Sequence, residues 1–220
     1  MKKMLLCAAA LIAFPAQAAQ VLPGTSGVTI DALDTSTRGT LLAYSETSGQ
    51  ALTFAATFRS AVYRNTGGTL DFYYQVVRTG VGSNGSDNEV TSFTAANFDS
   101  FTTFAFRDGS DFDGAGGFAA ANNPGGFTST ANRGNNGNVV GVHFGTNGLV
   151  GTDNSTTYIF RTNANAFTGG TFGVIDGSAL QGITFAPTVP EPATWAMMLG
   201  GFGLLGAAAR RSRRATAVLA

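Results

Sequence analysis

The chain has 220 residues, of which 44% are hydrophobic and only 12% are charged, and its formal net charge is zero. The charges are unevenly distributed, because six of the 13 basic residues lie at the two ends whereas all 13 acidic residues lie within 19–209. That segment has seven basic residues and therefore a net charge of −6. An acidic body argues against nucleic acid and anionic polymers as its partners, but it does not exclude neutral polysaccharide.

The N-terminus has the pattern of a secretory signal peptide. Two lysines precede an apolar run from Met4 to Phe14, and the small residues Ala16 and Ala18 form the cleavage site. We therefore predict that the general secretion machinery exports the chain and that signal peptidase removes residues 1–18. Cys7 is the only cysteine and lies in this segment, so the exported chain is expected to fold without disulfides.

Residues 19–186 have the composition of a β-rich domain. Glycine, threonine, serine and asparagine are abundant, lysine is absent, and apolar residues recur with period two in short runs. This pattern predicts one all-β domain, an antiparallel β-sandwich or a jelly-roll-like fold, which is long enough to bury a sizeable core. We found no internal repeat that would indicate a solenoid.

The clearest strand is predicted over 69–78. Its alternate residues form one face that we expect to be buried, namely Leu70, Phe72, Tyr74 and Val76. The opposite face carries Asp71, Tyr73, Gln75 and Val77. A second long strand is predicted around 52–63, and the sequence Asn65–Gly68 between the two is typical of a hairpin turn.

Shorter strands are predicted at six further places, 41–45, 101–107, 138–144, 157–162, 171–176 and 182–185. Residues 91–98 are predicted to form one helical turn. The segment 109–138 is predicted to be the longest surface loop, because its runs of glycine and asparagine cannot bury a core.

A proline-rich linker is predicted over 187–193, after the β domain. Pro190 and Pro192 restrict the backbone on both sides of Glu191, which holds this carboxylate on a stiff peptide. Pro192 also suits the first turn of a helix, where the carboxylate would lie near the positive end of the helix dipole.

The apolar segment 194–209 is predicted to be a transmembrane helix. Its 16 residues would be about 24 Å long as a helix, against a hydrocarbon core of about 30 Å. It is therefore short for a permanent anchor. The basic tail 210–220 follows, and the arginines predict a cytoplasmic C-terminus with the body exported across the inner membrane.

This C-terminal region resembles the PEP-CTERM sorting signal in its PEPxxWA variant. The residues that carry the resemblance are Pro190, Glu191, Pro192, Trp195, Ala196, Arg210, Arg211, Arg213 and Arg214. The resemblance implies that an exosortase, a membrane-embedded cysteine protease-like enzyme, processes the chain, which then reaches the cell surface or an exopolysaccharide matrix. On physical grounds alone, a proline-rich linker into a plain tail anchor is the alternative.

Parts of the body resemble a recurrent PEP-CTERM ectodomain. They are Ser60–Asn65, Gly68–Val76, Phe160–Ala164, Val174–Gly177 and Phe185–Pro187. These segments lie on predicted strands and turns, so the resemblance implies a β-rich fold and brings no catalytic residues.

Two motifs invite a ligand-binding interpretation. Gly80–Gly85 fits the Gly-x-Gly-x-x-Gly pattern of dinucleotide-binding proteins, but no amphipathic helix follows, so we predict a glycine-rich hairpin loop and no cofactor. Asp108, Asp111 and Asp113 have the carboxylate density of a calcium loop. Their spacing does not fit an EF-hand, which favours a solvated loop and leaves structural calcium as the alternative.

One histidine and four tyrosines are candidates for catalysis and for sugar binding. His143 is the only histidine, its alternation with valines predicts a solvent-facing side chain, and no Gly-x-Ser-x-Gly elbow supports a nucleophilic triad. Four tyrosines, Tyr63, Tyr73, Tyr74 and Tyr158, would form a sugar-stacking platform if exposed, although packing within a sheet is the commoner role.

Two functions remain open for the body. The first is a non-catalytic protein of the cell surface or matrix that packs with polysaccharide or with other copies. The alternative is a carbohydrate-binding module or a polysaccharide-acting hydrolase that uses exposed tyrosines and a pair of carboxylates. The absence of a catalytic motif and the low content of charged residues favour the first.

Overall fold

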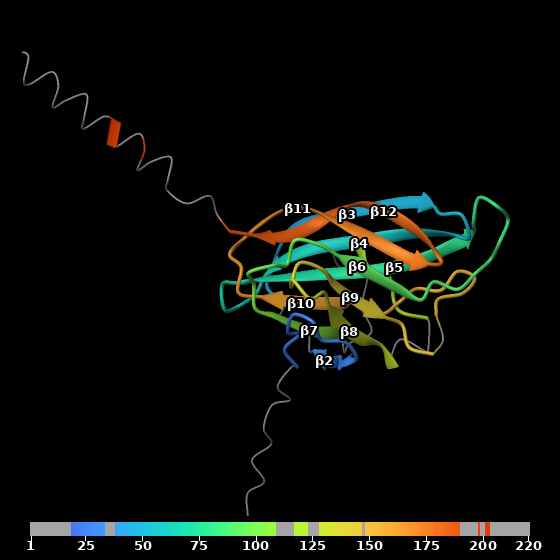
Figure 1. The fold of residues 1–220 in the computed structure, drawn as a ribbon, viewed down its shortest axis with the longest axis horizontal. Helices are drawn as coiled ribbons and strands as arrows, with labels where there is room; N and C mark the ends of the chain where they lie inside the picture. The colour runs from blue at the N-terminus through green and yellow to red at the C-terminus, as the bar shows by residue number, and fades with distance from the viewer. Residues whose placement is uncertain are drawn as a thin grey trace, which may run out of the picture.

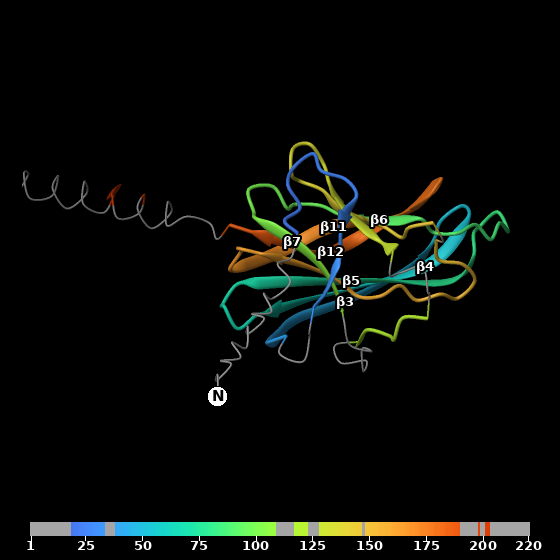
Figure 2. The same ribbon diagram turned by 90° about the horizontal axis from the view of Figure 1, so that it is seen from below.

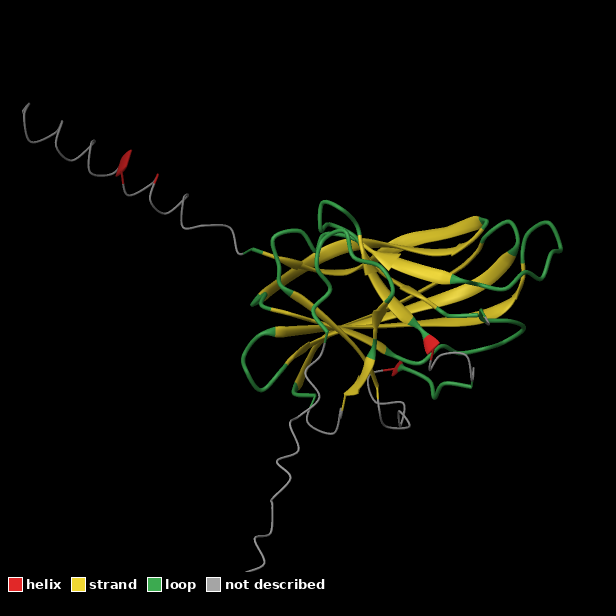
Figure 3. Cartoon of the chain, turned by 60° about the horizontal axis from the view of Figure 1, so that its bottom comes forward, coloured by secondary structure: helices red, strands yellow, loops and turns green. Residues whose placement is uncertain are grey.

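The alternating apolar segments form two six-stranded β-sheets that pack face to face (Figure 1). The computed structural model describes residues 19–33, 38–108, 117–122, 128–146, 148–189, 198 and 201–202. Figure 2 shows the two layers from the side, and Figure 3 shows that strands and loops make up the body. The predicted all-β fold is confirmed.

Sheet A contains, in spatial order, β2 (Asp31–Leu33), β7 (Thr103–Asp108), β10 (Tyr158–Thr162), β5 (Leu70–Val81), β4 (Phe54–Arg64) and β3 (Thr40–Gln50). Sheet B contains β1 (Val28–Thr29), β8 (Thr130–Arg133), β9 (Val140–His143), β6 (Ser92–Ala95), β11 (Ala166–Asp176) and β12 (Ser178–Thr188). All pairings are antiparallel except that of β2 with β7. The predicted antiparallel sandwich thus has one parallel pair at this edge, where the chain crosses from β1 in sheet B to β2 in sheet A.

The core lies between the sheets and is rich in aromatic side chains. The predicted inner face of β5 is confirmed, because Leu70, Phe72, Tyr74 and Val76 are all fully buried. Phe58 of β4 stacks on Phe172 of β11 with ring centroids 4.1 Å apart, which joins the two sheets. Burial of such a ring stabilises the fold by roughly 1.5–3 kcal/mol.

The outer face of sheet A is buried as well, which the alternation of β5 does not predict. Tyr73 and Gln75 are fully buried on this face because the segment 117–122 covers it. The Gln75 amide donates to the Ala119 carbonyl at 2.6 Å and accepts from the Ala119 N–H at 2.9 Å. Phe118 packs against Tyr73, so this segment closes a second apolar cluster outside the sheet.

Several local predictions are confirmed. The hairpin turn between β4 and β5 is present, with the Asn65 N–H donating to the Thr69 carbonyl and Gly68 at a φ of 84°. The strands predicted within 41–45, 101–107, 138–144, 157–162, 171–176 and 182–185 correspond to β3, β7, β9, β10, β11 and β12.

Three local predictions are wrong. Residues 91–98 contain the strand β6 instead of a helical turn, because this segment pairs with β9 and β11. The segment 109–138 includes the strand β8, which pairs with β1 and β9. The glycine-rich loop at 80–85 turns through a bond from the Gly82 N–H to the Ser86 carbonyl, but it leads from sheet A to sheet B and is not a hairpin.

The last strand extends beyond the predicted end of the β domain. We expected the domain to end at residue 186, whereas β12 continues through Pro187 to Thr188. No helix within the described part of the chain is long and apolar enough to cross a membrane. Most of the helix predicted over 194–209 lies outside that part, so it stays a prediction.

Candidate functional site

The end of β12 is the point from which the predicted sorting signal leaves the fold. Ala166 and Phe167 of β11 pair with Thr188 and Pro187, and Pro187 is buried. A proline is tolerated here because β12 is the edge strand of sheet B and one of its sides has no ladder partner. The last strand is thus part of the sheet up to its final residue.

A second contact ties β12 to the other sheet. The Tyr74 hydroxyl, from the inner face of β5, donates to the Phe185 carbonyl at 2.6 Å. Phe185 also packs edge-to-face against Phe167, with ring centroids 5.7 Å apart. Only Val189, which is exposed, separates this anchored strand from Pro190. The proline-rich sequence therefore starts from a fixed position at one end of the sandwich.

The residues predicted to act in processing lie outside the described part of the chain. They are Ala16 and Ala18 at the signal-peptide end and Pro190, Glu191, Pro192, Trp195, Ala196, Arg210, Arg211, Arg213 and Arg214 at the C-terminal end. Their roles remain predictions. What the structure adds is the position of Thr188, from which the C-terminal set follows.

The calcium alternative is only partly within the described residues. Asp108, at the end of β7, has a buried side chain, whereas Asp111 and Asp113 lie outside the described ranges. Within those ranges, no group of three or more acidic, histidine or cysteine residues is arranged to hold a metal ion. The alternative therefore gains no support from the described residues.

The four tyrosines pack within the fold, as favoured from the sequence, and the alternative of a sugar-stacking platform is wrong for them. Tyr63, Tyr73, Tyr74 and Tyr158 are all buried, with exposed fractions of 4% or less, so none offers a ring to a sugar. Burial raises the pKa of Tyr73, Tyr74 and Tyr158 above the ordinary value. These four tyrosines therefore give no support to the carbohydrate-binding alternative.

His143 lies where its alternation predicts. Val140 and Val142 are buried, while His143 is exposed on the outer face of sheet B. Its Nδ1 accepts a hydrogen bond of 3.2 Å from the Gly145 N–H. The bond gives His143 a local structural role at the end of β9.

Buried charges in the described residues hold loops and strands in place. The Arg133 guanidinium donates to the carbonyls of Val21, Phe98, Phe101 and Gly137. Desolvation lowers the pKa of Arg133. Arg78 likewise binds Gly151, Asp87 and Asn88, which joins two loops at the end of the sandwich farthest from Thr188.

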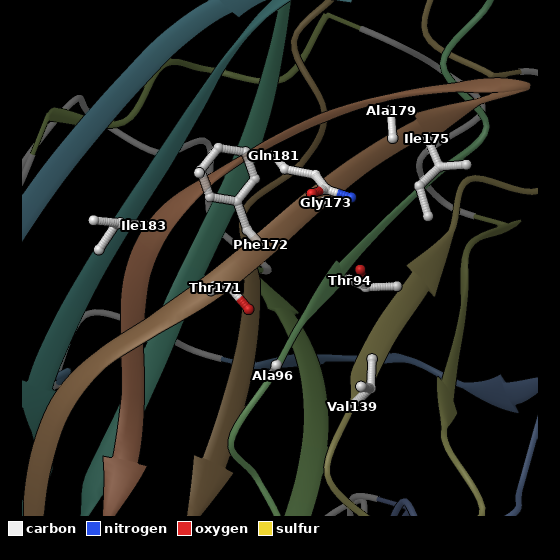
Figure 4. Close-up of a pocket in the computed structure, with 11 residues that line it drawn as sticks. Thr94, Ala96, Val139, Thr171, Phe172, Gly173, Ile175, Ala179, Gln181 and Ile183 are labelled. Carbon is white, nitrogen blue, oxygen red and sulfur yellow. The ribbon is translucent and has the colours of Figure 1, made fainter.

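A shallow groove on the outer face of sheet B was not predicted (Figure 4). It has a volume of about 500 Å³ and is lined by uncharged residues of β6, β11 and β12, with Ala96 just after β6 and Val139 just before β9. Of the lining residues, Thr94, Gly173 and Gln181 occupy neighbouring register positions on three strands, and Gly141 of β9 is the register partner of Thr94. A Cβ atom at Gly141 would lie 2.6 Å from the Asn132 side-chain oxygen, so this position requires glycine. The glycines within the predicted strands were the sequence signal that could have indicated this groove.

The structure thus shows a two-layer β domain whose last strand ends at Thr188, directly before the sequence predicted to be the sorting signal. The PEP-CTERM protein-sorting motif matches residues 188–214, so the chain carries this motif and the motif begins at the last residue of β12. The motif supports an exported protein that is targeted to an exosortase. No curated protein and no solved structure matches the chain.

Proposed function

We propose that the chain is an exported protein that exosortase delivers to the cell surface or to an exopolysaccharide matrix, and that its β-sandwich has no catalytic activity of its own. In this proposal the β-sandwich is the mature domain that reaches the final location. The segment after Thr188 is a sorting signal that holds the chain in the inner membrane, with its C-terminus inside, until the enzyme removes it.

One observation carries the proposal: the sorting motif starts at the last residue of the last strand. A cut in or after the Pro-Glu-Pro sequence would leave both sheets complete, because β12 is anchored through Pro187 and through the Tyr74 hydroxyl. A cut one strand earlier would remove an entire edge of sheet B. The position of the motif therefore supports processing that releases an intact sandwich.

The proposal predicts that Glu191→Ala blocks processing and leaves the stability of the sandwich unchanged. The substitution removes the carboxylate of the Pro-Glu-Pro sequence, which follows the end of β12, so we expect it to leave the core unchanged. Substitutions that leave the core unchanged usually alter stability by less than about 0.5 kcal/mol. The measurement is the mass and the cellular location of the protein in cells with exosortase. We expect the variant to lose its signal peptide, to keep its C-terminal segment and to remain in the membrane.

Glu89→Ala is the matched control, because Glu89 is an exposed carboxylate at the opposite end of the sandwich. It should be processed like the unaltered protein. Normal processing and release of the Glu191→Ala protein would contradict the proposed role of the motif. If neither variant were processed, the loss of processing in Glu191→Ala would not be specific to the motif.

A further inference from the structure

The two flanks of the sandwich are built differently. At one flank the edge strands are β1 and β2, which have two and three residues. At the other flank the edge strands are β3 and β12, which have eleven residues each and contact one another (Figure 1). Short edge strands protect a sheet from pairing with other chains, whereas long edges invite it. Only the flank of β3 and β12 is therefore long enough to accept another strand along its length.

The open side of β3 has backbone groups available for pairing. Within the described residues, β3 pairs with β4 alone, and its contact with β12 is a side-chain bond from the Thr47 hydroxyl to the Ile183 carbonyl at 3.4 Å. The bulge between Leu41 and Ala43 interrupts the strand near its start. The regular part that remains, 44–50, would span about 24 Å at about 3.4 Å per residue.

The side chains on this flank do not oppose association. The 44–50 segment contains neither lysine nor proline, two residues that commonly protect edges. Its one charge, Glu46, is paired with Arg59 of the neighbouring strand at 3.0 Å and accepts a bond from the Tyr44 hydroxyl. Exposed apolar surface lies beside it, since Leu41 is 43% and Ile183 is 73% exposed. Two copies would thus meet without an unpaired like charge on this strand.

We propose that the 44–50 segment of β3 pairs antiparallel with the same segment of a second copy, so that sheet A continues across a two-fold axis. An interface that uses the same surface on both copies is closed. Because the opposite flank ends in strands of two and three residues, the assembly stops at a dimer and does not grow into a fibre. The partner is a second copy because the 44–50 edge, with no lysine or proline and its one carboxylate paired with Arg59, is compatible with itself.

The size of the flank limits the strength of the dimer. A stable interface buries about 800 Å² on each partner, whereas a flank about 24 Å long and about 10 Å thick offers less. The dimer is therefore weak and dissociates on dilution. Analytical ultracentrifugation of the full chain in detergent, over a hundredfold range of concentration, should show a monomer–dimer equilibrium without larger species.

Ser48→Glu provides the test, because antiparallel pairing of 44–50 centres on residue 47 and puts the exposed Ser48 opposite Glu46 of the second copy, where a like charge destabilises the pair. We expect at least a tenfold weaker association. His143→Glu is the control, since His143 is exposed on the outer face of sheet B and away from this flank, and it should leave association unchanged. Equal weakening by both variants would overturn the proposal, as would a native chain that is monomeric throughout or forms fibres.

Cysteine cross-linking decides the matter if Ser48→Glu unfolds the domain. Cys7 is the only cysteine, so a Cys7→Ser background allows single cysteines to be placed at positions 45 to 49. An antiparallel pair brings only the residues nearest the axis within disulfide distance of their own copies. Cross-linked dimers at one or two adjacent positions on β3, and none for His143→Cys, would support the pairing. Equal cross-linking at every position would contradict it.

Discussion

At the scale of residues, the fold depends on a buried carboxylate that must keep its partners. Asp71 is fully buried, and its oxygens accept bonds of 2.8 Å from Arg161 and 2.8 Å from Asn65. The bond to Asp71 raises the pKa of Arg161. We predict that Arg161→Gln destabilises the domain by about 2 kcal/mol, measured by urea unfolding. Removing one partner of a fully buried ion pair costs roughly 3–5 kcal/mol. The loss expected here is smaller because the Arg161 side chain is 36% exposed.

Arg59→Gln is the control for that prediction. Arg59 binds Glu46 at 3.0 Å, but the Glu46 side chain is 42% exposed and stays solvated when the arginine is removed. The expected cost is therefore below about 1 kcal/mol. Equal losses in the two variants would mean that burial of Asp71 does not determine the effect.

At the scale of elements, the central strands β5 and β10 place three tyrosines where they cannot ionise without the strands opening. Burial raises the pKa of Tyr73, Tyr74 and Tyr158 above the value of about 10 for an unfolded chain, so the folded state holds these protons more tightly. Their contribution to stability is complete below about pH 10 and is lost as pH rises further.

We therefore predict that the free energy of unfolding falls steeply above about pH 10, measured by urea unfolding at a series of pH values. Tyr158→Phe should make the fall shallower. Ionisation of all five tyrosines near pH 10 in the folded protein, seen by ultraviolet difference absorbance, would contradict the burial of these side chains.

The strands that could be predicted from the sequence are those whose pattern reflects one buried face. The alternation of Leu70, Phe72 and Tyr74 and the Asn65–Gly68 turn define the hairpin of β4 and β5, because both signals are local. The positions of His143 and its neighbouring valines follow from the same alternation.

Features that depend on distant contacts could not be predicted. The four residues of β6 have no decisive local pattern and become a strand because β9 and β11 lie on either side. On the outer face of β5, Gln75 is buried where the segment 117–122 folds over it, a contact between residues about 44 positions apart in the chain. The groove requires Thr94, Gly173 and Gln181 to fall in register, and register between separate strands is not encoded within any one of them.

At the scale of the whole molecule, the strand direction relates sorting to assembly. β12 runs to Thr188, so the sorting motif leaves from one end of the sandwich. In the proposed antiparallel dimer the two Thr188 residues lie at opposite ends of the pair. Two chains that are still held in one membrane by their C-terminal segments would therefore be poorly placed to pair in this way. Processing would then release chains that are free to associate.

The most direct test of the central claim is the intact mass of the native protein recovered from outside the cells, compared between cells with and without exosortase. The account predicts a released chain that begins at Ala19, retains all of β12 through Thr188 and lacks the arginine cluster, and that is found only when the enzyme is present. A released protein that keeps Arg210–Arg214 would contradict the account, as would one cut within β12 or one released equally without exosortase.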